Sequence, residues 1–221
     1  MSDDSFFREV DQELRQDQAK AIWDRYGTAI IAAAVAVVLA TAAWVGWDYW
    51  SQSRADRSGD AYLHALELAR DGRTEEARAA LAELEAGGYG AYPVLARMRN
   101  ATLLAEAGDN AGAVAGFDRV AADGAVPAAI REMARLRAAL LLVDHGSYAD
   151  VAQRVETLTG ETNPLRHSAR EALALAAWKE GRMADAAALY DQIVDDEGAP
   201  QNIRQRATLM SELIRGSGAS S

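Results

Sequence analysis

An uncharged apolar run near the N-terminus constrains this chain more than any other feature. Residues 26–50 read YGTAIIAAAVAVVLATAAWVGWDYW, and no charged residue stands between Arg25 and Asp48. The 21 residues from Gly27 to Trp47 span about 30 Å as an α-helix, which matches the hydrocarbon core of a bilayer. This length predicts a membrane-spanning helix.

Aromatic residues flank the run on both sides, where tyrosine and tryptophan rings favour the headgroup layer of a membrane. They are Trp23 and Tyr26 before it, and Trp44, Trp47, Tyr49 and Trp50 at its end. A cleaved signal peptide and a buried core helix are the alternatives. A signal peptide has a short basic leader and a shorter apolar stretch, whereas the leader here is long and acidic. The flanks and the length therefore favour a permanent anchor that contacts membrane lipid.

Basic residues near the ends of the expected span predict its orientation, because lysine and arginine resist translocation. Four of them lie in the 20 residues before Gly27, and two lie in the 20 residues after Trp47. This asymmetry favours a cytoplasmic N-terminus. The expected parts are an acidic, partly helical cytoplasmic leader (1–26), the transmembrane helix (27–47), a juxtamembrane hinge or helical continuation (48–58), a repeat domain (59–215) and a flexible tail (216–221).

The segment after the expected span is acidic and contains no cysteine. Residues 48–221 hold 19 basic and 26 acidic residues, a net charge of −7. Phosphate backbones and anionic lipid surfaces are poor partners for such a domain, so no nucleic acid partner is expected. The lack of cysteine excludes disulfides, thiol catalysis and cysteine-ligated metals.

This segment repeats itself with a nearly constant period. Four stretches align on a glycine: GRTEEARAALAEL from Gly72, GDNAGAVAGFDRV from Gly108, GSYADVAQRVETL from Gly146 and GRMADAAALYDQI from Gly181. The glycines are 36, 38 and 35 residues apart. Glycine permits a tight turn between two antiparallel helices, so each stretch predicts a helical hairpin.

Small and large apolar residues keep the same register around each glycine. The small residues are Ala65, Ala101, Ala139 and Ala174, seven before it, and Ala77, Ala113, Val151 and Ala186, five after it. The larger ones are Leu81, Phe117, Val155 and Tyr190, nine after it, and Leu84, Val120, Leu158 and Ile193, twelve after it. Small residues let paired helices approach closely, and larger ones fill the space toward the next pair.

The pattern resembles the tetratricopeptide repeat in a degenerate form. The aromatic residue expected early in each first helix is replaced by Ala61, Arg97, Arg135 and Arg170. After Pro200, apolar residues at helical spacing predict a final helix that covers the last hairpin; they are Ile203, Ala207, Met210 and Ile214. The predicted fold is all-α, with one transmembrane helix, an α-solenoid of about four degenerate hairpins and a C-terminal capping helix.

The order of these parts resembles the YfgM-like family of membrane-anchored ancillary subunits of the bacterial Sec translocon. The most specific pieces are RYG, which ends at Gly27, the G-W-x-Y-W pattern from Gly46 to Trp50, and the leader FFREVDQELR, which is similar to alphaproteobacterial members. The resemblance implies a scaffold in the inner membrane with a periplasmic repeat domain. It also implies two partners, the Sec channel and a membrane-anchored periplasmic chaperone of the prolyl-isomerase type. The alternative is a scaffold of the same architecture that serves cell division or wall synthesis.

No motif for catalysis, a cofactor or a metal is found in the sequence. His64, His145 and His167 fall in three different repeats without metal-ligand spacing, so solvated or helix-end histidines are expected. The acidic run from Asp195 to Glu197 precedes a turn and is expected to face solvent. We therefore predict neither enzyme activity nor a small-molecule substrate.

The first helix of each repeat supplies the candidate partner-binding residues. In tetratricopeptide arrays its inner face lies 13, 10, 6 and 3 residues before the turn glycine. The candidates at these positions are Tyr62, Leu66, Leu95, Met98, Met133, Leu136, Leu140, Leu175 and Trp178. They form either a groove for a partner helix or unfolded segment, or a part of the core in helices rotated from the standard register.

The leader has one further pattern. Phe7, Val10, Leu14, Ala21 and Ile22 fall near one helical face. This suits a solvated juxtamembrane helix or a helix that docks onto a cytoplasmic partner.

Overall fold

The computed structural model describes residues 3–216 and Gly218, with side chains placed for Lys20 and from Trp23 onward. In this part of the chain every regular element is a helix. The chain divides into two compact units, residues 1–54 and 55–221. The apolar face predicted in the leader and most of the tail at 216–221 lie outside the described side chains.

The first unit consists of the N-terminal part of α1 (Asp3–Arg70), which contains the apolar run. From Trp23 onward this helix is long and apolar enough to cross a membrane, and none of its most apolar stretch is buried. All six flanking aromatic residues are exposed as well. By length and composition the helix is a candidate membrane span.

Residues 48–58, for which the sequence left a hinge or a helical continuation open, are helical and belong to α1. The boundary between the two units falls within this segment, after Arg54. Within the second unit the segment is tied to the loop between α2 and α3, because the backbone N–H of Tyr89 donates to Ser58 Oγ at 2.9 Å.

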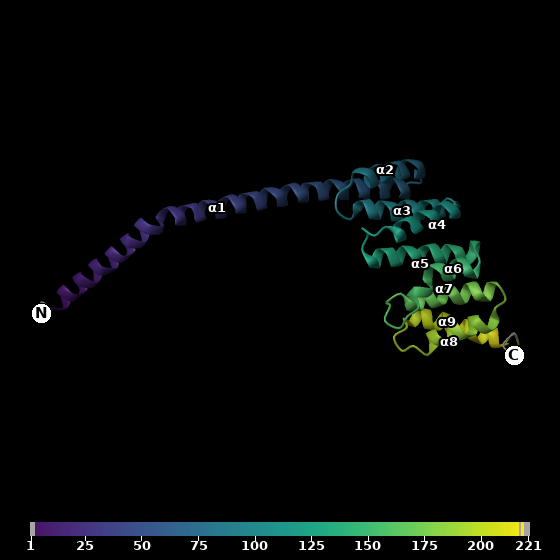
Figure 1. The fold of residues 1–221 in the computed structure, drawn as a ribbon. Helices are drawn as coiled ribbons and strands as arrows, with labels where there is room; N and C mark the ends of the chain where they lie inside the picture. The colour runs from purple at the N-terminus through teal and green to yellow at the C-terminus, as the bar shows by residue number, and fades with distance from the viewer. Residues whose placement is uncertain (1–2, 217, 219–221) are drawn as a thin grey trace. The chain divides into compact units, whose positions relative to one another are not determined.

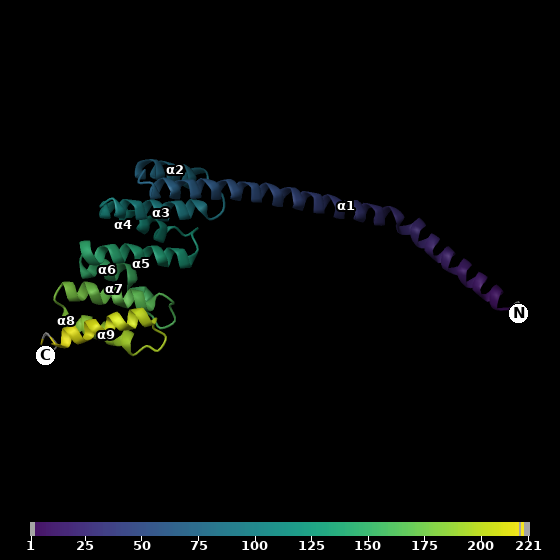
Figure 2. The same cartoon turned by 180° about the vertical axis from the view of Figure 1, so that it is seen from behind.

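The second unit is a stack of helices with nearly parallel or antiparallel axes (Figures 1 and 2). After the end of α1 come α2 (Thr74–Gly87), α3 (Tyr92–Glu106), α4 (Asn110–Ala122), α5 (Ala128–His145), α6 (Tyr148–Val155), η1 (Glu156–Leu158), α7 (Arg166–Lys179), α8 (Met183–Val194) and α9 (Gln201–Gly216). They pair as α1 with α2, α3 with α4, α5 with α6 and α7 with α8, and α9 covers α8. The predicted fold class is confirmed for the described residues.

The apolar positions that the sequence aligns on the turn glycines are the buried positions of the core. All sixteen aligned positions are buried, and the most exposed of them, Leu84, is 5% exposed. Ala65, Ala77 and Leu81 pack together in the first hairpin, and Ala174, Ala186 and Tyr190 pack in the last. Ile203, Ala207 and Ile214 of α9 are buried against that last hairpin.

Three of the four turn glycines have the left-handed backbone that the tight turn requires. φ is +77° at Gly72, +85° at Gly108 and +75° at Gly181. After each of them the next residue donates its N–H to the carbonyl five residues earlier, as Arg73 does to Leu68 at 2.9 Å. This bond satisfies a carbonyl at the helix end, and a side chain with a Cβ is strained at such a φ.

Gly146 differs, because its φ is −131°. Here Ser147 and Asp150 form a capping box that begins α6. A Cβ on Gly146 would lie 2.8 Å from Leu142 Cδ2, so this glycine is favoured by close packing against Leu142 rather than by its backbone conformation. Its place at the turn was predicted, but the reason for it was not.

Gly116 lies at a close contact between α3 and α4 and gives a test of the packing. A Cβ added there would lie 2.9 Å from Ala101 Cβ, so Gly116→Val should force α3 and α4 apart. We expect the free energy of unfolding to fall by about 1 to 3 kcal/mol, measured by chemical denaturation with circular dichroism as the signal. Gly124→Ala is the control, because its Cβ meets open space. Equal stability of the two variants would contradict this packing.

Candidate partner-binding surface

Eight of the nine predicted partner-binding residues are accessible at the surface of the repeat domain. Leu95, Met133, Leu140 and Trp178 are exposed. Tyr62, Leu66, Met98 and Leu175 are half-buried. These side chains are therefore available for contacts beyond the chain's own core.

Leu136 is the exception, and its assignment to a groove is wrong. It is 5% exposed and packs in one cluster with Val151 of α6 and with Ala169 and Ala172 of α7. Ala172 stands nine residues before Gly181, where the two preceding repeats have Arg99 and Arg137. The small side chain lets α5 close onto α7, so Leu136 faces that contact instead of solvent.

Four of the predicted residues meet in one groove, although they come from three different helices. Tyr62 is on α1, Leu95 and Met98 are on α3, and Met133 is on α5. The groove, here called the inner groove, has a volume of about 280 Å³ and is also lined by Arg99, Thr102, Ile130 and Arg137. The other surface candidates do not line it.

The two arginines of the inner groove were not predicted. Arg99 and Arg137 each stand nine residues before a turn glycine, so successive repeats present an arginine at the same position. Arg137 Nη1 donates to Thr102 Oγ1 at 3.1 Å, and Arg99 Nη1 lies 3.1 Å from Glu106 Oε1. Their shared distance from the glycine was the sequence signal that would have revealed them.

The inner groove suits protein side chains better than a small molecule. Its volume is slightly below the range of about 300 to 1,000 Å³ that small-molecule pockets have. Tyrosine and methionine give broad and adaptable apolar contacts, which are typical of surfaces that bind other proteins. The groove can therefore receive a few side chains of a partner helix or segment.

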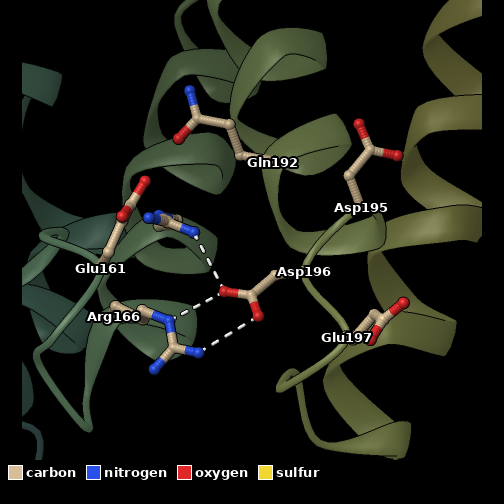
Figure 3. A pocket seen from close by; sticks show the side chains of 7 residues that line it. Glu161, Arg166, Gln192, Asp195, Asp196 and Glu197 are labelled. Atoms are coloured by element: carbon tan, nitrogen blue, oxygen red, sulfur yellow. Dashed lines mark hydrogen bonds and ion pairs between the residues drawn. The ribbon is translucent and has the colours of Figure 1, made fainter.

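A second, larger cavity is polar (Figure 3). It has a volume of about 570 Å³ and is lined by Glu161, Arg166, Arg170, Gln192, Asp195, Asp196 and Glu197. Arg166 points at the Asp196 carboxylate in Figure 3, with Nε 2.8 Å from Oδ2 and Nη2 3.1 Å from Oδ1. Arg170 Nη1 lies 3.6 Å from the same carboxylate.

Asp196 is therefore the centre of a charge cluster, and the expectation that it simply faces solvent is wrong. The hydrogen bond from Arg166, assisted by the backbone N–H of Gly198, lowers the pKa of Asp196 to about 2. Its neighbours Asp195 and Glu197 are exposed as expected. The cluster joins the loop after α8 to the beginning of α7.

His167 beside this cluster is also unlike the expected solvated histidine. It is the second residue of α7, so its helix-end position was predicted correctly, but it is only 4% exposed. Burial, together with the nearby charge of Arg166, lowers its pKa. His64 and His145 are exposed.

No arrangement suited to a metal stands out. Among the described residues there is no group of three histidine, cysteine, aspartate or glutamate side chains placed to hold a metal ion.

Two of the three arginines that replace the usual aromatic residue, Arg97 and Arg170, each reach a carboxylate. Arg97 Nη1 lies 2.9 Å from Asp123 Oδ2, and Asp123 is 26 residues further along the chain. Arg170 and Asp196 have the same separation. In both repeats the arginine of the first helix therefore reaches the loop that follows the second helix. Arg97 and Arg170 do not require their helices to be rotated, because their charged ends lie at loops.

The Asp196 cluster gives a pH-dependent prediction. The pKa of Asp196 is lowered in the folded state, so its contribution to stability is present above its ordinary pKa of 3.8 and is lost as pH falls toward 2. Asp196→Asn should lower the melting temperature at pH 7, and the difference from the unmodified protein should shrink between pH 4 and pH 2. Asp195→Asn is the control and should melt like the unmodified protein throughout. A constant difference across this range would contradict the role of the ionised carboxylate.

The stacked hairpins define an α-solenoid, in which each repeat is a pair of antiparallel helices. The surfaces of such solenoids commonly bind other proteins. The chain belongs to the tetratricopeptide repeat-like domain family, whose model matches residues 20–199. Comparison with curated proteins and with solved structures found no match. Membership of this family supports a protein-interaction role for the repeat domain.

Proposed function

We propose that this protein is a non-enzymatic scaffold, anchored in a membrane by α1, that binds partner proteins through its repeat domain. The observation that carries the proposal is the inner groove on the surface of a tetratricopeptide repeat-like domain. The exposed apolar side chains of α1 support the anchor, because leaving them in water costs about 25 cal/mol for each Å² of apolar surface.

The more specific role that we propose is that of an ancillary subunit of the bacterial Sec translocon in the inner membrane. In this role the N-terminus is cytoplasmic and the repeat domain is periplasmic. The span contacts the Sec channel, and the repeat domain binds a membrane-anchored periplasmic chaperone of the prolyl-isomerase type. The RYG and G-W-x-Y-W patterns around the span and the distribution of basic residues support this role.

Photo-crosslinking in cells tests both parts of this proposal. One photoreactive residue replaces Val38, which is exposed on α1, and another replaces Met98 in the inner groove. We expect Sec channel subunits to be captured from Val38 and the periplasmic chaperone from Met98. A probe at Ala188, exposed on α8, is the control for non-specific capture. Capture of division or wall-synthesis proteins instead would keep the scaffold and overturn the Sec role.

Substitutions in the inner groove separate binding from folding. Leu95 and Met133 are each 37% exposed, so Leu95→Ser with Met133→Ser should remove capture from Met98 while changing the melting temperature little. Leu136→Ala, in the core, should instead cost about 2 to 5 kcal/mol of stability. Crosslinking and thermal denaturation of the same variants measure the two effects. Unchanged capture by the double variant would contradict the groove as the binding surface.

A further inference from the structure

The inner groove has the opposite charge from the domain that carries it. Residues 48–221 have a net charge of −7. The eight residues that line the groove include two arginines and no acidic residue. By contrast, four carboxylates line the polar cavity around Asp196. The groove is therefore a local basic site on an acidic protein.

Arg137 supplies most of the available positive charge. It is exposed, and its hydrogen-bond partner, Thr102, is neutral. Its guanidinium also lies 6.0 Å from the centre of the Phe117 ring, and this neutral ring does not cancel the positive charge. Among the described residues no carboxylate forms an ion pair with it. Arg99 differs, because Glu106 partly neutralises its charge.

Apart from the arginines, the lining of the inner groove is mostly apolar and comes from three first helices. Tyr62 comes from α1, Leu95 and Met98 from α3, and Ile130 and Met133 from α5. Because side chains from all three helices line one groove, the apolar stripe of a single partner helix can contact more than one of them.

We propose that the inner groove binds an amphipathic helix of a partner protein that carries carboxylates beside its apolar stripe, and that Arg137 selects for them. The inference rests on the proposed scaffold function and adds the chemistry of its partner. The apolar stripe lies over Leu95, Met98 and Met133, and a carboxylate accepts hydrogen bonds from Arg137. A lysine at the same place meets a like charge. One exposed ion pair changes affinity by about fivefold or less.

Three designed helical peptides test the charge preference. They share one leucine stripe and differ in the flanking residues, which are glutamate, glutamine or lysine. Fluorescence anisotropy measures their binding to the full chain in nanodiscs of zwitterionic phosphatidylcholine at low and high salt. We expect the glutamate peptide to bind about fivefold more tightly than the glutamine peptide at low salt, and the lysine peptide to bind weakest. High salt should reduce these differences.

Substitution of Arg137 identifies the residue responsible. Arg137→Gln should remove most of the preference for glutamate over glutamine, and Arg137→Lys should retain it. Arg119→Gln removes an exposed arginine of α4 that is not part of the groove, so it is the matched control and should keep the preference. Circular dichroism confirms that all variants are folded.

The results distinguish this inference from the scaffold function. Equal binding of the glutamate and lysine peptides, or a preference that survives Arg137→Gln, overturns the selection by Arg137. Failure of all three peptides to bind overturns the helix-binding groove. Neither result affects capture of Sec channel subunits from Val38, which tests the scaffold separately.

Discussion

The close approach of paired helices at small residues is the constraint on which the rest of the repeat domain depends. An alanine seven residues before each turn is buried in all four hairpins. At Gly116 the second helix comes so close to Ala101 that a single Cβ would collide. The stacked hairpins bring side chains from α1, α3 and α5 into one groove.

Polar contacts between residues about one repeat apart hold the hairpins in this arrangement. Arg154 forms two hydrogen bonds with Asp118, which is 36 residues away, and Arg206 forms two with Glu171, which is 35 residues away. The Arg170–Asp196 pair adds a contact between α7 and the loop after α8. Each of these partly exposed pairs contributes little by itself, so they add to the helix packing rather than determine it.

Anchoring in a membrane makes a small groove that binds weakly compatible with the proposed scaffold. When two proteins are both anchored in the same membrane, each meets the other at a high effective concentration, so a weak contact can suffice. A groove with a few apolar side chains and one unpaired guanidinium fits such a contact. Its charge then contributes more to the choice of partner than to affinity.

The sequence by itself determined the apolar helix, the repeat period and the buried positions, because hydrophobic spacing reports which residues share a helix face. It did not determine which neighbour each face meets. Leu136 was expected at the same inner face as Met98, but the small residues of α7 draw it into the core. The paired Asp196, the buried His167 and the two groove arginines likewise depend on contacts between elements far apart in the chain. Only the tertiary structure decides such contacts, since they follow from how the helices pack and not from the period of any one helix.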